Sequence, residues 1–385
     1  MSPVAQRMTR RFVVNAVNLF GRGSRSILES CVDTLIRHLP ADWEAEVYVG
    51  DAAGLGAAPN VRITTVTPRH GRWAGRLWFE LFDLKRREAG RRVDIFLSLQ
   101  NASARIEAGL KVAYCGQNLP LAAMPLVQMW AHKRVAVQRF IYGFLYRFAI
   151  GQRTLVIVQQ QWTRQAFAAR YGLTRSMVAR PVPADSVPAR WRRPPVTPQT
   201  HLTILAPLAA FPHKDVETVI AAARALALRN PDFSLDLTVD PAESAYAAAL
   251  AASAADVPQL RFIGLLPRDQ LDQAYATRHL MLFSSRIESW GLPLSEARAH
   301  GIGILAVDHP YAHEAIGDYD GVSFFPAGDS LAIARMIHDY WTGTASLGSS
   351  RASQPPPPYA ANWPDLLAQL LTMAQQSTEA DQKIC

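Results

Sequence analysis

The sequence has 385 residues, of which 49% are hydrophobic and 19% charged, and its mean hydropathy is close to zero. This profile is typical of a globular protein of two domains and excludes a disordered or collagen-like chain. The three cysteines, Cys31, Cys115 and Cys385, are widely spaced and form no metal-binding pattern, so we expect no structural disulfide and a reducing, cytoplasmic compartment. The basic first residues lack the apolar core of a secretion signal, and the longest apolar stretch, residues 140–150, is too short to span a bilayer.

The formal net charge of +8 is distributed unevenly along the chain. Residues 1–200 contain 29 lysines and arginines against 12 acidic residues, whereas residues 201–385 contain 11 against 20. A basic half attracts anions, which here means nucleic acid, anionic lipid or a phosphorylated acceptor. The alternative is an arginine-rich surface that serves only solubility.

The first half alternates apolar runs with helical patterns. It opens with a strand at 11–20, a glycine-rich turn at 21–26 and a helix at 27–39. Further strands are predicted at 44–50, 61–67, 93–100, 110–116 and 155–160, and a helix follows at 162–172.

A proline-rich stretch, residues 181–200, separates the two halves and is typical of a stiff linker. We therefore predict an N-terminal domain over residues 1–195 and a second domain over residues 196–345. A further break at 343–358 precedes a C-terminal segment, 359–385, whose amphipathic helix we expect to pack back across the domains.

The second half repeats the alternation of strand and helix. Strands are predicted at 202–208, 235–240, 260–266, 280–285 and 303–308, with helices at 214–229, 245–254, 268–277 and 293–301. The pattern predicts an α/β protein of two doubly wound, Rossmann-like domains. Since ligands bind at the carboxyl ends of the strands in such sheets, we expect the site in a cleft between the domains.

The segment 280–301 is the most informative stretch of the sequence. A buried strand ends at Ser284 and Ser285, and the loop after it carries Glu288. A helix is predicted to begin near Pro293, which places Glu296 one turn into it. The N-terminus of a helix attracts anions, and a carboxylate accepts hydrogen bonds from the vicinal hydroxyls of a ribose or a hexose. Two glutamates eight residues apart would otherwise be ordinary solvated side chains.

The run from Glu288 through Ser-Trp-Gly-Leu-Pro-Leu-Ser to Glu296 resembles the E-x7-E motif of the nucleotide-sugar-dependent glycosyltransferases of the GT-B fold, family 4, with Trp290 where phenylalanine is usual. Residues 211–226, 260–275 and 303–318 are similar to further segments of that family. The first half resembles it more weakly, at 18–30, 111–121 and 155–167.

The resemblance implies roles for the residues of this motif. Glu296 would bind the ribose of the nucleotide. Glu288, with the backbone N–H groups of Gly291 and Leu292, would hold the transferred sugar. Ser285 lies in the same donor-binding segment. Members of the family retain the anomeric configuration and need no metal, so none is expected here.

Three further positions enter through the resemblance. Lys214 would neutralise the pyrophosphate. The alternative is an ordinary surface lysine at the start of a helix, where a positive charge is slightly unfavourable. Gly21 and Gly23 would let the N-terminal loop close over the phosphates, or they form an ordinary turn.

Two departures from the family pattern concern the chemistry. No arginine precedes Lys214 in residues 206–213, and Arg286 is the candidate to replace it. Gln117 stands where relatives often have a histidine, and glutamine is neither an acid nor a base. Gln117 remains a candidate for the catalytic site through hydrogen bonds to a sugar, and the donor phosphate would then deprotonate the acceptor.

The implied function is transfer of a hexose to a glycan, lipid-linked or lipopolysaccharide acceptor. Segments 69–92 and 129–153 mix arginines with aromatic residues, which is typical either of domain core or of a helix lying on anionic lipid. We therefore predict a cytoplasmic protein that docks peripherally on the inner face of the plasma membrane. The alternatives are a non-catalytic sugar-nucleotide-binding partner of another transferase and a nucleic-acid-binding protein. No nucleic-acid-binding motif supports the second alternative.

Overall fold

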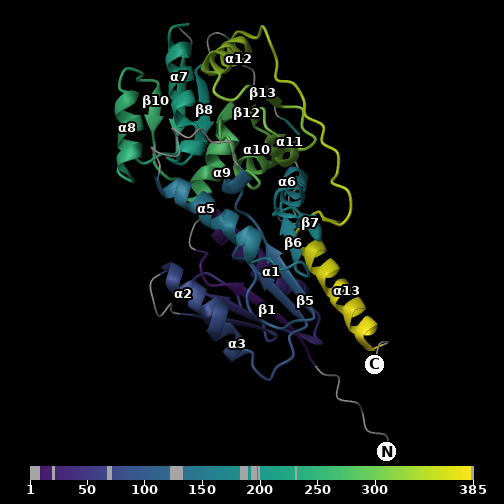
Figure 1. Ribbon diagram of the computed structural model, residues 1–385. Coiled ribbons are helices and arrows are strands. Elements are labelled where there is room, and N and C mark those ends of the chain that lie inside the picture. Colours follow the sequence, from purple (N-terminus) through teal and green to yellow (C-terminus); the bar gives the residue numbers. More distant parts are fainter. Residues whose placement is uncertain are drawn as a thin grey trace, which may run out of the picture. The chain divides into compact units, whose positions relative to one another are not determined.

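The computed structural model describes residues 9–19, 22–66, 72–121, 133–182, 190–191, 197, 200–229 and 232–382. The chain divides into two compact units, each built on one parallel sheet with helices around it (Figure 1). One unit comprises Met1–Leu121, Arg134–Asp185 and Pro355–Cys385, and the other comprises Ala122–Lys133 and Ser186–Gln354. Most of the predicted linker, residues 181–200, lies outside the described residues.

The sheet of the first unit has eight parallel strands in the order β14-β7-β6-β5-β4-β1-β2-β3. The bounds of these strands are β1 Arg10–Ala16, β2 Trp43–Val49, β3 Val61–Thr65, β4 Ile95–Ser98, β5 Leu110–Tyr114, β6 Leu155–Val158, β7 Ser176–Ala179 and β14 Tyr359–Ala360. The helical segments are α1 Arg22–His38, α2 Arg72–Trp78, the π-helical turn η1 Phe79–Asp83, α3 Leu84–Arg87, the 3-10 turn η2 Leu119–Leu121, α5 Lys133–Phe148, α6 Gln161–Tyr171 and α13 Trp363–Gln382. The strands β4, β6 and β7 are buried along their whole length, as expected for a parallel sheet covered by helices, whereas the edge strand β3 is partly exposed.

The start of α1 corrects one prediction. The glycine-rich turn predicted over residues 21–26 is wrong for residues 22–26, which already form the first turn of α1. A glycine in an exposed first turn costs about 1 kcal/mol relative to alanine. The burial of Leu28, Val32 and Leu35 along the same helix more than offsets that cost.

The C-terminal helix α13 belongs to the first unit. It packs against α1 and the strands β4 and β5. The ring of Trp363, its first residue, stacks on Tyr114 of β5 with ring centroids 5.5 Å apart. Side chains of α13 between Trp363 and Ala374 therefore complete the core of the first unit.

The sheet of the second unit has six parallel strands in the order β10-β9-β8-β11-β12-β13. The bounds of these strands are β8 Leu202–Ala206, β9 Phe233–Leu237, β10 Leu260–Phe262, β11 Leu280–Phe283, β12 Gly303–Val307 and β13 Val322–Phe325. The helical segments are the 3-10 turn η3 Pro212–Lys214, α7 Val216–Ala227, α8 Ala245–Ser253, α9 Arg268–Thr277, α10 Leu292–His300, α11 Pro310–Ile316 and α12 Ser330–Thr342.

The strand order of the second sheet reverses between β8 and β11. The chain runs from β8 through β9 to the edge strand β10 and then returns to place β11 on the other side of β8. In doubly wound sheets, ligands bind at the carboxyl ends of the two strands between which the order reverses. The residues that follow β8 and β11 are therefore the first place to look for a ligand site.

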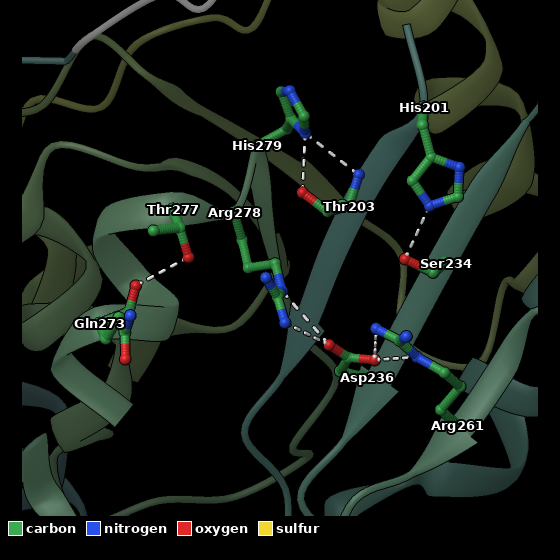
Figure 2. A network of polar contacts seen from close by, with 9 residues as sticks. All are labelled: His201, Thr203, Ser234, Asp236, Arg261, Gln273, Thr277, Arg278 and His279. Carbon is green, nitrogen blue, oxygen red and sulfur yellow. Dashed lines mark hydrogen bonds and ion pairs between the residues drawn. The ribbon is translucent and has the colours of Figure 1, made fainter. Parts of the chain in front are cut away.

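An ion-pair network around a buried carboxylate joins strands of the second sheet (Figure 2). The carboxylate of Asp236 on β9 is 1% exposed and accepts from Nε of Arg261 on β10 at 2.6 Å. It also accepts from Nη2 of Arg278, just before β11, at 2.8 Å. The network fixes the positions of β9, β10 and the start of β11 relative to one another.

Candidate active site

Lys214 and Glu288 form an ion pair in the second unit. Lys214 ends η3, which follows β8, and Glu288 lies in the loop after β11. The ammonium group of Lys214 donates to Oε1 of Glu288, and the two side chains are only 19% and 15% exposed. Since β8 and β11 are neighbouring parallel strands, their following loops meet at one edge of the sheet. The structure thus brings together two residues that the sequence assigns to pyrophosphate and sugar.

Hydrogen bonds to backbone atoms hold these two loops against each other. Oγ of Ser284 donates to the carbonyl of Lys214 at 2.8 Å, and the N–H of Arg286 donates to the carbonyl of His213 at 2.7 Å. The hydroxyl of Ser285 donates to the carbonyls of His213 and Ile287, at 3.4 and 3.2 Å. Ser285 therefore shapes the loop, and its predicted contact with the donor stays a prediction.

Arg286 pairs with Asp215, the residue after Lys214. Nε of Arg286 lies 3.0 Å from Oδ2 of Asp215, and Nη2 donates to Oδ1 at 3.0 Å. Asp215 has a left-handed backbone with φ of +56°, which aspartate tolerates better than most residues. The guanidinium charge is thus matched by a carboxylate, and the proposed replacement of a phosphate-binding arginine by Arg286 stays a prediction.

The start of α10 requires glycine at position 291. Gly291 precedes the helix with φ of +86°, and a Cβ there would lie 3.2 Å from Cδ1 of Leu294 and 3.4 Å from the ring of Tyr311. Leu292 begins the helix, and the buried Trp290 fixes this turn by donating from Nε1 to Oγ of Ser295 at 2.7 Å. The first turn of a helix presents backbone N–H groups that have no partner within the helix, which suits an anionic or hydroxylated ligand.

Glu296 has a separate set of partners, contributed by α9. Its Oε1 accepts from Nη1 of Arg268 at 2.5 Å, and its Oε2 accepts from the hydroxyl of Tyr275 at 3.1 Å. Arg268 also pairs with Asp272 at 2.9 Å. Sequence reasoning missed Arg268 and Tyr275, because a helix pattern does not reveal which residue of a neighbouring helix a charge will meet.

His213 lies directly beside the Lys214–Glu288 pair. Burial, reinforced by the neighbouring ammonium group of Lys214, lowers the pKa of His213 from 6.5 to about 4. Its ring stacks on that of Phe211, with centroids 5.7 Å apart. His213 is therefore neutral at neutral pH and adds no charge to the site.

The remaining predicted site residues belong to the first unit. Gln117 follows β5; its carbonyl accepts from the hydroxyl of Tyr146 at 2.9 Å, and its Oε1 accepts from the N–H of Leu119 at 3.4 Å. Gly23 is exposed in α1, and a Cβ there would meet no heavy atom within 4 Å. Gly21 lies outside the described residues. The roles predicted for these three residues stay predictions.

Among the residues described by the structure, no group of three or more His, Cys, Asp or Glu side chains is placed to hold a metal ion. Within the same ranges, no helix combines the length and the apolar character needed to cross a bilayer.

Residues 189–345 match the family described as Glycosyl transferases group 1. The matched segment contains Lys214, Glu288 and Glu296, so the similarity to this family includes the geometry described above. A search of curated protein sequences gives no significant match.

Solved structures of glycosyltransferases resemble the whole chain. WaaG, a glycosyltransferase involved in lipopolysaccharide biosynthesis, has a TM-score of 0.59 at 16% identity, covering 96% of this chain and 95% of that one. HepE of Anabaena in complex with UDP-glucose has a TM-score of 0.61 at 15% identity, covering 97% and 99%. Sucrose-phosphate synthase of Thermosynechococcus elongatus has a TM-score of 0.59 at 14% identity, covering 97% and 99%. These similarities confirm the predicted fold class, two Rossmann-like α/β units as in GT-B glycosyltransferases.

Proposed function

We propose that this chain is a retaining, metal-independent glycosyltransferase that moves a hexose from a nucleoside-diphosphate sugar to a glycan or lipid-linked acceptor. The observation that carries the proposal is the Lys214–Glu288 ion pair beside the reversal of strand order in the segment that matches the group 1 family. A sugar diphosphate offers a partner to each member of that pair. Its phosphates attract the ammonium group, and its sugar hydroxyls donate to the carboxylate.

Each residue of the site has a task in the proposed reaction. Lys214 and the first turn of α10 stabilise the negative charge that develops on the leaving diphosphate. Glu288 fixes the sugar through its hydroxyls. Glu296 accepts from the ribose hydroxyls: Arg268 and Tyr275 take one lone pair from each carboxylate oxygen, which leaves one on each oxygen for a vicinal diol.

The bond exchange takes place on one face of the sugar. The acceptor hydroxyl oxygen forms a bond to the anomeric carbon while the bond from that carbon to the phosphate oxygen breaks. The proton of the hydroxyl passes to the departing phosphate oxygen, so the step needs no basic side chain, which is consistent with Gln117 in place of histidine. The configuration at the anomeric carbon is retained.

The proposed acceptor follows from the basic first half and from the resemblance to transferases of the cell envelope. WaaG takes part in lipopolysaccharide biosynthesis. We infer a cytoplasmic enzyme that works on a lipid-linked acceptor at the inner face of the membrane. HepE binds UDP-glucose, which makes UDP and its sugars the first donors to test.

The proposal is tested by donor binding and turnover. A thermal-shift panel of UDP, GDP, ADP and their sugar conjugates identifies the donor, since a ligand that binds only the folded state raises Tm. Lys214→Ala and Glu296→Ala are then expected to lower the Tm shift and to lose most donor hydrolysis and transfer. Arg224→Ala, in an exposed pair with Asp256 of the same unit, is the control expected to keep both.

Three outcomes decide between the proposed function and its alternatives. Turnover that survives EDTA and gives a product of unchanged anomeric configuration by NMR supports the metal-independent, retaining mechanism. Tight donor binding without hydrolysis or transfer favours a non-catalytic sugar-nucleotide-binding partner of another transferase. Wild-type turnover in Lys214→Ala contradicts the role assigned to the ion pair.

A further inference from the structure

The helical segment from Arg76 to Glu88 in the first unit exposes several large apolar side chains and buries several charged ones. Its charged residues Arg76, Glu80 and Glu88 are buried. Phe79 and Leu84 pack into the core of the unit. Four other large apolar residues, which we call the aromatic ridge, are exposed: Leu77, Trp78, Leu81 and Phe82, the last 53% exposed. A helix on the surface of a globular protein ordinarily turns its apolar side inward. An apolar face turned outward is typical of a surface that binds an apolar partner.

Paired charges lock the segment in this orientation. Nε of Arg76 and Nδ2 of Asn15 both donate to Oε1 of Glu80, each at 3.1 Å. Glu88 accepts from Nη2 of Arg11 at 2.9 Å and from the hydroxyl of Tyr48 at 2.6 Å. Rotating the ridge inward would unpair these buried charges, at a cost that burial of the ridge would not recover.

Basic side chains continue the exposed face by one helical turn. Lys85 and Arg86 are exposed four residues after Leu81 and Phe82, at the spacing that places side chains on one face of a helix. Together with Arg91 they border a pocket of about 500 Å³ whose apolar wall includes Phe82 and Val93. Two acids also line this pocket: Glu88, which is paired as described above, and the exposed Glu107.

The helix α5 adds a second apolar stripe next to this segment. Arg76 donates a hydrogen bond to the hydroxyl of Tyr142 on α5. Phe140, Phe144 and Phe148 recur at helical spacing on α5 and are exposed, Phe140 by 76%. Exposed apolar side chains are therefore present on α5 as well as on the segment from Arg76 to Glu88.

We propose that the aromatic ridge and the neighbouring Lys85, Arg86 and Arg91 form a docking site for the surface of an anionic phospholipid bilayer. The ridge inserts at the boundary of headgroups and acyl chains, and the three cations bind lipid phosphates, one of them at the pocket. The apolar ridge matches the acyl chains of a leaflet, and the adjoining cations match its anionic headgroups. A nucleic acid would match only the three cations. Its phosphates would not cover a ridge of leucine and aromatic side chains.

The inference extends the proposed function, because a lipid-linked acceptor lies at a membrane. The two are nevertheless tested separately, since vesicle binding is measured without donor or transfer. A protein that binds vesicles but transfers no sugar would contradict only the proposed function.

The test is flotation of the full-length protein with vesicles of phosphatidylcholine alone and of equal parts phosphatidylcholine and phosphatidylglycerol. We expect binding to the anionic vesicles at low salt and much weaker binding to the neutral ones. Phe82→Ser should lower the partition coefficient roughly tenfold. Lys85→Glu/Arg86→Glu should lower it by about 25-fold or more, because each cation near an anionic leaflet contributes about fivefold.

Matched controls change exposed residues elsewhere. Leu331→Ser removes an exposed leucine of the second unit, and Arg62→Glu reverses an exposed charge on β3 of the first unit. Both should leave vesicle binding within about twofold of wild type, with Tm unchanged in all variants. Hydrogen exchange of the wild type on vesicles should show new protection in residues 77–92.

Four results would overturn the inference. They are absence of binding to anionic vesicles at low salt, equal binding to neutral vesicles, equal losses in the control variants, and protection that falls only outside residues 77–92. Each can be obtained with the folded wild-type protein or with variants at exposed positions, so a folding defect does not decide the result.

Discussion

The ammonium group of Lys214, which follows β8, binds the carboxylate of Glu288, which follows β11, beside the point where the strand order of the second sheet reverses.

The two members of this pair are expected to serve different parts of the donor. Glu288→Gln should leave affinity for the nucleoside diphosphate unchanged or raised, because it releases Lys214 from a competing carboxylate, while kcat falls about 100-fold. Lys214→Ala should weaken nucleotide affinity about tenfold or more. Calorimetric titration with the nucleoside diphosphate, set beside steady-state transfer rates, measures both effects, and an equal loss of nucleotide affinity in the two variants would contradict the division of roles.

Arg268 and Tyr275 are expected to act as positioning residues for Glu296. Arg268→Ala and Tyr275→Phe should each raise the KM for the donor about tenfold with little change in kcat, because a hydrogen bond to a charged group contributes about 1.5–3 kcal/mol. The loss should be specific to the ribose. The variants should bind the nucleoside diphosphate more weakly than wild type but should bind its 2′,3′-dideoxy form as wild type does. Equal losses for both nucleotides would instead indicate a general structural defect.

In the network around Asp236, removal of the two arginines should destabilise the protein more than removal of the aspartate. The double variant Arg261→Ala/Arg278→Ala leaves a buried carboxylate without its two cations and should lower the free energy of unfolding by about 3–5 kcal/mol. Asp236→Ala should cost less, since the two guanidinium groups left behind are partly exposed and can be solvated. Urea unfolding measures both, and Arg224→Ala at the exposed pair with Asp256 should stay within about 1 kcal/mol of wild type. A larger loss for Asp236→Ala than for the double variant would refute the argument.

His213 predicts a loss of stability in acid. Its pKa is lowered to about 4 in the folded protein, so between pH 6.5 and about 4 the unfolded chain binds a proton that the folded chain does not. The free energy of unfolding therefore falls as pH falls through this window, by about 3 kcal/mol, and this contribution levels off below about pH 4. His213→Gln should flatten that part of the Tm–pH curve. His38→Gln, at an exposed position on α1, should leave the curve unchanged, and a flattening of similar size there would show that His213 is not the cause.

Much of the fold could be predicted from the sequence because its signals are local. The apolar runs that became β8, β9 and β11 are strongly buried in a parallel sheet, and each is followed by a helical pattern. The short strand β7 was missed, because four residues are too few to show a strand pattern in the sequence. It forms by pairing with β6, the preceding strand, and with β14, which lies far away in the sequence. The helices α11 and α12 and the strand β13 were also not predicted. The alternation of strand and helix in the second unit therefore continues beyond the last predicted strand, residues 303–308.

The candidate site was predicted where residues adjoin a strand end and a helix start. Gly291, Glu288 and Glu296 share one strand–loop–helix segment, so their spacing alone places them near a helix N-terminus. Lys214 came from the resemblance, and the pairing of β8 with β11 accounts for its contact with Glu288. The partners of Glu296 were not predictable, because Arg268 and Tyr275 reach it from another helix.

The amino-acid order by itself determined the alternation of strand and helix, the division of charge and the turn before α10, since each depends on residues close together in the chain. Only the tertiary structure decided which charges meet: Lys214 with Glu288, Arg268 with Glu296, and Arg76 with Glu80. It also decided that Trp78 and Phe82 face outward, which the sequence left open between core and membrane surface. The reason is physical: periodicity shows which side chains share a face, but the pairing of buried charges across strands and helices determines which face turns inward.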